Sequence, residues 1–559
     1  MTFSKIACLL LAVIGLHMSP SVYGQPSTDV ESPRIINIVN FIRQTDYRLA
    51  NSDSLLFDAV QEQIKLVNTY GFPATFLFQY DALINPAYQQ LMKTQLSDQC
   101  ELGAWWEITQ PHVEAAGIPW RGEHSWVSHA NIAFTTGYTP TEREKLVDVY
   151  MAKFKEIYGH YPQSVASWFI DAHTLAYMHD KYDIVASANC KDQVGTDGYT
   201  LWGGYWNQAY YPSRKNAYLP AQHADNQIPV PIFRMLGSDP IYQYDTGLGR
   251  SRQGVISLEP VYPASGGDKK WVTYFLESLV NQPSLAFSYA QAGQENSFTW
   301  AAMGDGLRMQ FALFDSLRRA DQIRLETLGH SGAWFKKQFP ITPATAVTAL
   351  TDVRDEGRKT IWYNSRYYRT NLLWEEGSFR FRDIHLFDEQ FESAYLKTAG
   401  SGSQFFYYAL PLVDGFNWST PEDRAGFRLM AEDAKGNSIA IVLADPVISG
   451  NGNQVLEIRS TDEQGHTFII TCYEDRFTVR CDNPTEGFRW HLQFHAAAQA
   501  ELPFQAMDNK HLRARFRGFD YGITCINGHI AMDGWEVARS FQLLPENHEL
   551  AIDCTNTQR

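Results

Sequence analysis

The chain has 559 residues, of which 44% are hydrophobic, 19% are charged and 14% are aromatic. This length predicts two or three domains, and this composition excludes a chain that is mostly disordered. The net charge of −15 at pH 7 disfavours nucleic acids and anionic membranes as partners.

The N-terminal segment has the pattern of a secretory signal peptide. An apolar run covers residues 6–16, and Val22 and Gly24 stand at the small-residue positions of a cleavage point before Gln25. The run is too short to span a membrane, and no later stretch reaches about 18 uninterrupted apolar residues. We therefore expect residues 1–24 to be a signal peptide, the mature protein to be secreted or periplasmic, and no transmembrane segment.

Apolar runs typical of strands then alternate with amphipathic segments typical of helices. Strands are expected at residues 34–41, 74–78, 101–106, 165–170, 183–188, 230–235, 254–258 and 284–289. Helices are expected at residues 53–70, 87–96, 141–158, 174–182, 270–280 and 300–328. This repeat predicts a (β/α) barrel of seven or eight strands within residues 25–344. A doubly wound sheet is the alternative, but no Gly-x-Gly-x-x-Gly follows the first strand, which disfavours a dinucleotide site.

The pattern changes near residue 345 to short alternating runs separated by Gly, Asn and Asp turns. We expect a β-rich segment packing on the barrel at residues 345–410 and a C-terminal all-β, sandwich-like domain at residues 411–559. The cysteines form no Cys-x-x-Cys pair, which disfavours a zinc ribbon. Cys472 and Cys481 flank an expected hairpin and are the pair expected to form a disulfide in an oxidising compartment.

Residues 34–188 resemble the polysaccharide-deacetylase superfamily of barrels. The resemblance lies in a strand with an Asp just past it, an amphipathic helix, Phe-Pro-Ala-Thr-Phe-Leu-Phe, a helix and Glu-Leu-Gly-Ala-Trp-Trp-Glu. In that family, the third strand usually leads into a metal-binding His-x-x-x-His. Trp105 and Trp106 stand there instead, and indoles do not ligate divalent ions. His124 and His129 remain the alternative metal ligands, and we expect no metal and no cofactor.

A barrel of this kind without its metal resembles the inverting exo-sialidases built on the deacetylase-like barrel. Those enzymes place an Asp after the first strand and a His after the fourth, and Asp46 and His173 match these positions. Catalytic side chains collect at this end of barrel strands. In extended geometry Asp171 and His173 face the same way, so Asp171 is expected to orient the imidazole. We interpret Asp46 as the acid and His173 as the base. A loop salt bridge, a helix cap and a core histidine are the structural alternatives.

Aromatic and polar side chains in an insert at residues 197–220, and in a segment past the barrel, are expected to bind a sugar by stacking and hydrogen bonding. Acidic side chains that follow strands are further candidates, with helix capping as their alternative. The substrate-binding candidates are Trp105, Trp106, Glu107, Trp202, Tyr205, Trp206, Tyr211, Arg214, Asn216, Glu259, Glu295, Asn364, Arg366 and Tyr367. A self-packed surface loop is the structural alternative for the aromatic insert.

His385 stands between Asp383 and Asp388 in a segment dense in titratable groups. This segment either completes the site over the barrel mouth or forms a buried salt-bridge network.

The sequence thus predicts a secreted glycoside hydrolase that acts on an oligosaccharide or polysaccharide, with sialic acid or another acidic sugar as the leading substrate class. The first alternative is a metal-dependent polysaccharide deacetylase using Asp46, His124 and His129. The second is a glycan-binding protein without catalysis. No Gly-x-Ser-x-Gly elbow, P-loop or zinc-protease signature is present.

Overall fold

The computed structural model describes residues 32–375, 377–433, 435–451, 454–532 and 539–556. The expected signal peptide at residues 1–24 lies outside the described residues. Within the described part, no helix combines the length and the apolar character needed to cross a membrane.

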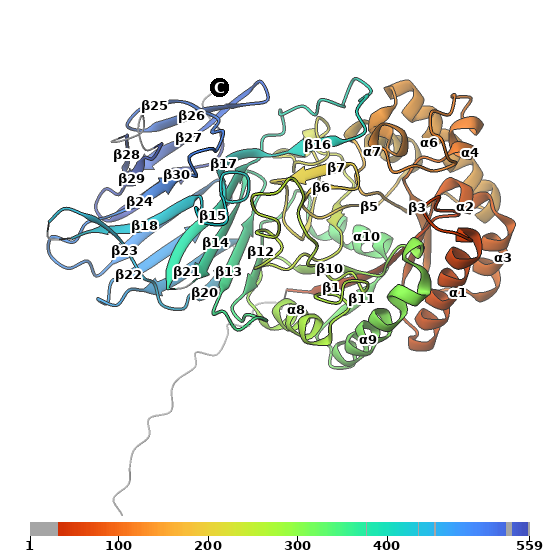
Figure 1. Cartoon of the computed structure of the whole chain (residues 1–559), viewed down its shortest axis with the longest axis horizontal. Coiled ribbons are helices and arrows are strands. Elements are labelled where there is room, and N and C mark those ends of the chain that lie inside the picture. The colour runs from red at the N-terminus through yellow and green to blue at the C-terminus, as the bar shows by residue number, and fades with distance from the viewer. Residues whose placement is uncertain (1–31, 376, 434, 452–453, 533–538, 557–559) are drawn as a thin grey trace, which may run out of the picture. The chain divides into compact units, whose positions relative to one another are not determined.

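Seven parallel strands form a barrel in the N-terminal half, in the spatial order β10-β1-β2-β3-β4-β5-β9 (Figure 1). A short antiparallel strand, β8, pairs with β9, and β11 pairs in parallel with β1. The strands are β1 (Arg34–Ile42), β2 (Thr75–Phe78), β3 (Glu101–Trp105), β4 (Ser164–Ala166), β5 (Ala186–Asn189), β8 (Ala209–Tyr210), β9 (Ile232–Arg234), β10 (Ser288–Ala292) and β11 (Arg324–Glu326).

Side chains close the barrel between β9 and β10, where the hydrogen-bonded path of the described sheet is open. The rings of Phe233 on β9 and Tyr289 on β10 lie 4.9 Å apart across this seam. Strand β12 (Thr345–Ala349) lies against β10, and the Thr348 hydroxyl donates a 2.8 Å hydrogen bond to the Pro283 carbonyl. A strand from the second half of the chain therefore covers the seam.

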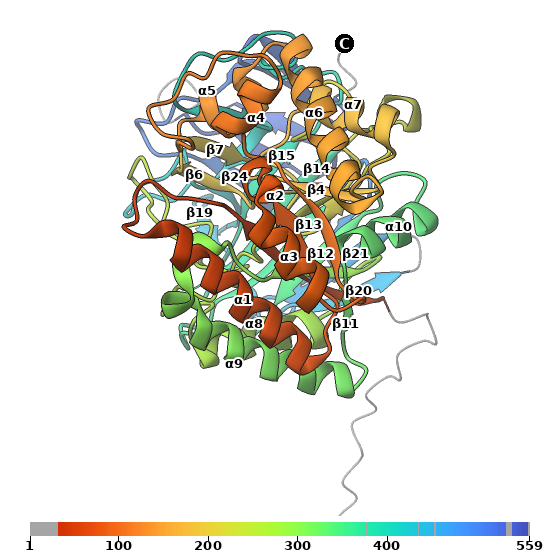
Figure 2. The ribbon, with the colours of Figure 1, turned by 90° about the vertical axis from the view of Figure 1, so that its right-hand side faces the viewer.

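Helices pack on the outside of the barrel, and α1 lies beside α9 (Figures 1 and 2). Helix α1 buries Leu56, Val60, Ile64 and Val67, the apolar face expected from its sequence. It ends at Gly71, whose φ of 61° is the left-handed conformation that glycine adopts without strain. The helices are α1 (Ser52–Tyr70), α2 (Tyr80–Ile84), α3 (Pro86–Gln95), α4 (Gln110–Ala115), α5 (Ala130–Ala133), α6 (Pro140–Tyr158), α7 (Ala172–Tyr182), α8 (Lys269–Asn281), α9 (Thr299–Arg319) and α10 (Leu328–Gln338).

Two barrel elements differ from expectation. The strand expected at residues 254–258 is irregular, because the Gln243 side chain bonds the Ile256 amide and the Gly254 carbonyl that a neighbouring strand would need. The helix expected at residues 300–328 ends at Arg319. Asp321 then adopts a left-handed φ of 54°, and the chain continues as β11 and α10.

The C-terminal half is all-β, and its largest sheet is ten-stranded. This sheet takes strands from both sides of residue 411, while the expected boundaries at residues 345 and 411 stay predictions. Its strands are β12, β13 (Lys359–Asn364), β14 (Tyr368–Glu375), β15 (Ser378–Leu386), β17 (Leu410–Asp414), β18 (Gly426–Glu432), β19 (Ser438–Ala440), β24 (Trp490–His495), β28 (His529–Ala531) and β29 (Gln542–Leu544).

An eight-stranded sheet packs face to face on the larger one. Ring contacts join the two inner faces, with centroids 5.3 Å apart for Phe381 and Phe477 and 5.5 Å apart for Phe468 and Trp490. Its strands are β20 (Val447–Asn451), β21 (Val455–Thr461), β22 (Thr467–Cys472), β23 (Arg476–Asp482), β25 (Phe504–Met507), β26 (His511–Phe516), β27 (Phe519–Asn527) and β30 (Glu549–Asp553). The expected fold class, a (β/α) barrel followed by an all-β sandwich, is confirmed.

The strand register contradicts the expected disulfide between Cys472 and Cys481. Cys472 pairs with Phe477 and Cys481 pairs with Phe468, so the two thiols stand on neighbouring strands but not opposite each other. All six described cysteines are free.

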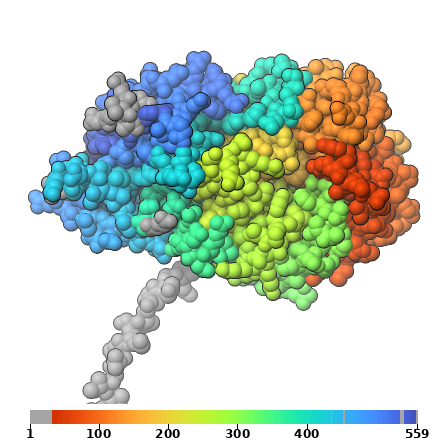
Figure 3. Space-filling view, viewed as in Figure 1, coloured from red at the N-terminus to blue at the C-terminus, as the bar shows by residue number. Residues whose placement is uncertain are grey.

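The barrel segments, coloured red to green, and the β-rich segments, coloured cyan to blue, lie side by side (Figure 3). A third, three-stranded sheet joins them, in which β16 (Phe405–Tyr408) pairs in parallel with β7 (Tyr199–Trp202), next to β6 (Gln193–Thr196). Trp206 of the barrel insert stacks on Trp362 of β13, with centroids 3.8 Å apart and planes 1° from parallel.

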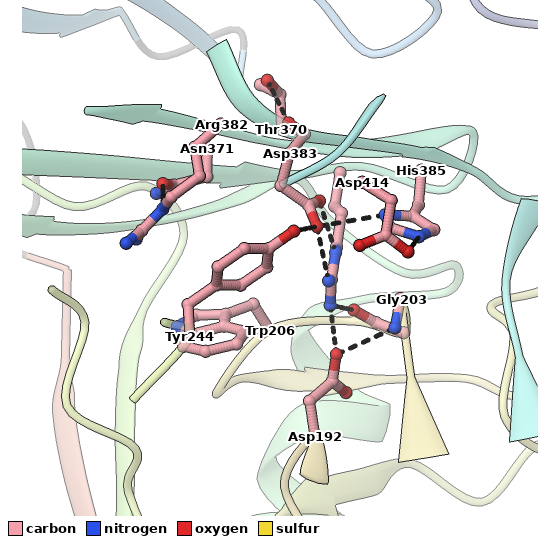
Figure 4. Close-up of polar contacts among 12 residues, drawn as sticks. Asp192, Gly203, Trp206, Tyr244, Thr370, Asn371, Arg382, Asp383, His385 and Asp414 are labelled. Carbon is pink, nitrogen blue, oxygen red and sulfur yellow. Dashed lines mark hydrogen bonds and ion pairs between the residues drawn. The ribbon is translucent and has the colours of Figure 1, made fainter. Parts of the chain in front are cut away.

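A buried ion network crosses the same contact (Figure 4). Arg369 on β14 binds Asp383 on β15 through two hydrogen bonds of 2.8 and 2.9 Å. The same guanidinium pairs with Asp192, which follows β5 of the barrel, and donates 2.7 Å to the Gly204 carbonyl. The sequence left open whether the segment around His385 completes the site or forms a buried salt-bridge network. Asp383 belongs to a buried salt-bridge network.

Candidate active site at the barrel mouth

A cavity of about 340 Å³ opens at the carboxyl ends of the barrel strands. Its acidic side chains are Asp46, Glu107, Asp197 and Glu295, which follow β1, β3, β6 and β10. Asp46, Glu107 and Glu295 follow parallel barrel strands, whose carboxyl ends meet at one face, whereas Asp197 lies in the turn between β6 and β7 of the insert. Three arginines and five aromatic residues complete the wall, namely Arg43, Arg48, Arg252, Trp126, Phe134, Trp168, Tyr262 and Phe298.

Arg43 lies between two carboxylates and is only 3% exposed. It binds Glu107 through two hydrogen bonds of 2.9 and 2.8 Å, and its Nη1 lies 2.9 Å from Glu295. The guanidinium also lies over the Trp126 ring, 4.3 Å from the centroid. A planar guanidinium suits bidentate binding of one carboxylate, so Arg43 compensates Glu107 more fully than Glu295.

Both carboxylate oxygens of Glu107 accept hydrogen bonds from other side chains of the protein. Its Oε2 also accepts hydrogen bonds from Gln79, at 2.6 Å, and from the Trp105 indole, at 2.9 Å. With four donors on one buried carboxylate, Glu107 fixes Arg43 and the barrel wall. This arrangement makes Glu107 a positioning residue.

Glu295 is the incompletely compensated carboxyl group. Burial raises its pKa, Arg43 lowers it, the nearby Glu107 carboxylate raises it again, and the net pKa is about 7. The group is 6% exposed and lines the cavity. A carboxylic acid that stays partly protonated near neutral pH is suited to donate a proton.

Asp46 has the opposite electrostatic environment in the same cavity. Burial raises its pKa, but hydrogen bonds and charge from Arg48 outweigh burial and lower the pKa below the ordinary value. The Arg48 Nε donates 2.8 Å to Asp46 Oδ1, while the Arg48 side chain itself is 46% exposed. Asp46 is therefore an ionised carboxylate held by an arginine that faces solvent. The loop salt bridge considered from the sequence exists, and it lies within the cavity wall.

The structure does not bring Asp171 and His173 to the cavity. Asp171 is the N-cap of α7, where it accepts from the Thr174 amide and pairs with Arg143 at 2.9 Å. His173 lies in the first turn of α7, and its Nε2 is 3.0 Å from Glu144 on α6. Asp171 thus holds Arg143 rather than the imidazole.

The aromatic insert packs against the β-rich half and against helix α10 rather than around the barrel-mouth cavity. The Trp202 indole donates to Asp414, the Tyr205 hydroxyl donates to the Pro343 carbonyl, and Tyr211 donates to the Phe339 carbonyl. Trp206 is stacked as described above. These four residues are buried, and none of them lines the barrel-mouth cavity.

The remaining polar candidates also have structural partners. Arg214 pairs with Asp180 on the surface, and Asn216 donates to the Phe391 carbonyl. Arg366 pairs with Glu474 and lies beside the Tyr367 ring.

Asn364 accepts from the Trp206 amide, and Trp106 is buried against the His112 ring. Glu259 does not line the cavity; burial raises its pKa, and Ser257 donates a 2.7 Å hydrogen bond to it.

The donor set does not fit the divalent metal of the deacetylase resemblance. Among the described residues, no group of three or more His, Cys, Asp or Glu side chains could hold an ion. His124 and His129 are exposed. His112 is buried, its Nε2 lies 2.8 Å from a backbone carbonyl, and burial lowers its pKa to about 4. Trp105 and Trp106 stand where the resemblance would place a metal-binding histidine, and an indole has no atom that ligates a divalent ion.

Sequence reasoning missed Arg43, Trp126, Trp168 and Arg252. Trp168 lay inside the strand expected at residues 165–170, but β4 ends at Ala166, so Trp168 lies past the strand end where site residues collect. Trp126 lies between the two histidines weighed as metal ligands, so attention to the aromatic residue in that loop would have found it.

Comparisons with known proteins give one family match and several similar solved structures. Residues 128–326 match a family described as a domain of unknown function with a solved structure (DUF3863). None of the curated proteins matches the chain. Similar solved structures include a candidate glycoside hydrolase/deacetylase from Parabacteroides distasonis, with 15% identity, a TM-score of 0.48, and coverage of 71% of this chain and 89% of that one. A candidate polysaccharide deacetylase from Mycobacterium smegmatis has 10% identity, a TM-score of 0.36, and coverage of 56% and 94%.

Proposed function

We propose that the protein hydrolyses glycosidic bonds in a glycan at the barrel mouth, with Glu295 as general acid and Asp46 as the carboxylate that activates water. The observation that carries this proposal is the opposite pKa shift of two carboxyl groups lining one cavity. Glycosidases use such a pair, because the leaving oxygen needs a proton and the attacking water must lose one.

In the proposed reaction, one carboxyl group gives up a proton and the other takes one up. Glu295 donates its proton to the glycosidic oxygen as the bond to the sugar breaks. Asp46 accepts a proton from the water that attacks the sugar carbon. The Glu295 carboxylate that results lies 2.9 Å from Arg43, whose positive charge stabilises it.

The arginines of the cavity favour an acidic sugar, such as a sialic or uronic acid. Arg48 and Arg252 are exposed at the cavity, and a guanidinium binds a sugar carboxylate through two parallel hydrogen bonds. The Trp126 and Trp168 rings supply apolar surface for a sugar ring. The apolar run at residues 6–16 supports export of the protein to the periplasm or the medium.

Aryl glycosides of sialic, glucuronic and galacturonic acids, with the corresponding neutral glycosides, test the proposal. We expect release of the aryl group from an acidic glycoside, unaffected by EDTA and lost in Asp46→Asn and Glu295→Gln. Proton NMR of the first-formed sugar distinguishes the inversion expected for a water-activating Asp46 from retention. Binding of these glycosides without turnover would favour the non-catalytic alternative, and EDTA-sensitive acetate release would favour the deacetylase.

A further inference from the structure

A second cavity, of about 390 Å³, lies in the β-rich half of the molecule. Four aromatic side chains line it, namely Trp202, Tyr408, Trp418 and Phe516. Its polar lining is His385, Asp414, Asn417, Gln499, Glu501 and Arg517. The volume lies within the roughly 300–1,000 Å³ of small-molecule sites.

A buried imidazole, that of His385, lines this cavity and lies between the carboxylates of Asp383 and Asp414 (Figure 4). His385 is 1% exposed, and its Nδ1 lies 3.1 Å from Asp383. Its Nε2 lies 3.7 Å from Asp414, which is beyond a normal hydrogen bond. A gap of that length between two buried polar groups suits a bridging hydroxyl group.

The other partner of this gap is held firmly in place. Asp414 accepts hydrogen bonds of 2.9 Å from the Trp202 indole and 2.8 Å from the Asn417 amide. Gly203 allows the imidazole to approach, because a Cβ there would lie 2.5 Å from a His385 ring carbon. The polar end of the cavity is therefore built from side chains whose positions are fixed by packing.

The outer wall combines aromatic faces with both signs of charge. Arg517 lies over the Tyr408 ring, 4.3 Å from its centroid, and Phe516 meets the same ring edge-on at 5.8 Å. Burial lowers the pKa of His385, but Asp383 and Asp414 outweigh burial and raise it. Among the groups that line the cavity, the Arg517 guanidinium stands with two carboxylates, those of Asp414 and Glu501.

We propose that this second cavity binds one neutral sugar unit. The aromatic faces pack against the C–H face of a pyranose, and the amide, carboxylate, imidazole and guanidinium groups bond its hydroxyls. A lining with two carboxylates and one guanidinium selects against acidic sugars. One hairpin serves both cavities, because Thr196 and Asp197 line the barrel mouth and Trp202 lines the second cavity.

Saturation-transfer difference NMR on the full chain tests this site, with the methyl glycosides of glucose, galactose, mannose and N-acetylglucosamine as probes. We expect at least one probe to bind, with its Kd raised at least tenfold in Tyr408→Ala and in Arg517→Ala. Arg515→Ala is the matched control. Arg515 lies two residues before Arg517, is exposed on β26 and does not line the cavity.

Three outcomes would overturn the site. None of the four probes binds, binding is unchanged in both Tyr408→Ala and Arg517→Ala, or binding is lost in Glu295→Gln instead. Melting curves of each variant exclude unfolding as the cause of lost binding. The proposed catalysis is assayed separately with the aryl glycosides, so binding without hydrolysis overturns the catalytic proposal and supports the second site.

Discussion

Arg43 contacts two carboxylates at the barrel mouth, and it binds one of them more strongly than the other. It forms two hydrogen bonds with Glu107 and one ion-pair contact with Glu295. Glu107 also has Gln79 and Trp105 as donors, whereas Glu295 relies mainly on Arg43 in a buried setting. The difference leaves the proton of Glu295 available near neutral pH.

Glu295→Gln tests the role of this proton. We expect kcat to fall about 10²- to 10⁴-fold with little change in KM, because the amide keeps the shape and cannot donate an acidic proton to the leaving group. In the parent enzyme, kcat/KM is expected to fall as the pH rises through about 7, the pKa of Glu295. Glu277→Gln, an exposed change on α8, is the control. Unchanged activity of Glu295→Gln would contradict the assignment.

Asp81 is a second buried carboxyl group with a shifted pKa. Burial raises the pKa, backbone amides lower it, and the net value is about 7 against an ordinary 3.8. The native state therefore binds more protons than the unfolded state between about pH 4 and pH 7. The free energy of unfolding falls as the pH rises through this window, by at most about 1.4 kcal/mol per pH unit.

Asp81→Asn is expected to flatten this dependence and to be the more stable form by roughly 4 kcal/mol at pH 8, because the amide needs no deprotonation. Urea denaturation at pH 5 and at pH 8 measures the difference. Asp58→Asn, an exposed substitution on α1, should leave the pH dependence as it is. Parallel curves for Asp81→Asn and the parent protein would refute the explanation.

At the scale of elements, the start of helix α7 explains why Asp171 and His173 do not lie together with the other expected site residues. The rule that functional groups follow barrel strands placed Asp46, Glu107 and Glu295 correctly in one cavity wall. It failed at Asp171 and His173 because α7 begins at Ala172. Two residues that span a helix start do not face the same way, as they would in a continuous strand.

The aromatic insert could not be interpreted from its own sequence. The same tryptophans and tyrosines suit sugar stacking or burial under another layer, and only the partner decides. That partner includes Trp362 and Asp414, more than 150 residues later in the chain. The fold class was predictable because hydrophobic periodicity is local, whereas contacts between distant segments are not.

Gly203 provides a test at the same scale. Its φ is 87°, and an added Cβ would lie 2.5 Å from the His385 ring. Gly159 ends α6 with a similar φ of 84° and nothing within 4 Å of an added Cβ. Both alanine variants strain the backbone, so we expect Gly203→Ala to cost about 1–3 kcal/mol more than Gly159→Ala. Equal costs in urea denaturation would contradict the close packing at His385.

At the scale of the whole molecule, the two halves share a core. The stack of Trp206 on Trp362 and the ion network around Arg369 are both buried and both join barrel and β-rich segments. A shared core favours unfolding of the described part in one transition rather than two.

Trp362→Ala removes the centre of that contact. We expect a loss of about 3–5 kcal/mol of unfolding free energy, as for other buried aromatic residues, and separate transitions for the two halves. Calorimetry resolves the transitions. Trp300→Ala, on the partly exposed side of α9, is the control and should cost far less. A single unshifted transition in Trp362→Ala would rule out this coupling.

The seam between β9 and β10 has a consequence for the width of the barrel. A cylinder joined by peptide hydrogen bonds all round has a fixed circumference. Here one join consists of the Phe233 and Tyr289 rings, so the circumference can widen slightly without breaking any backbone pairing. Because β12 lies against this join, the β-rich half limits how far the barrel can widen.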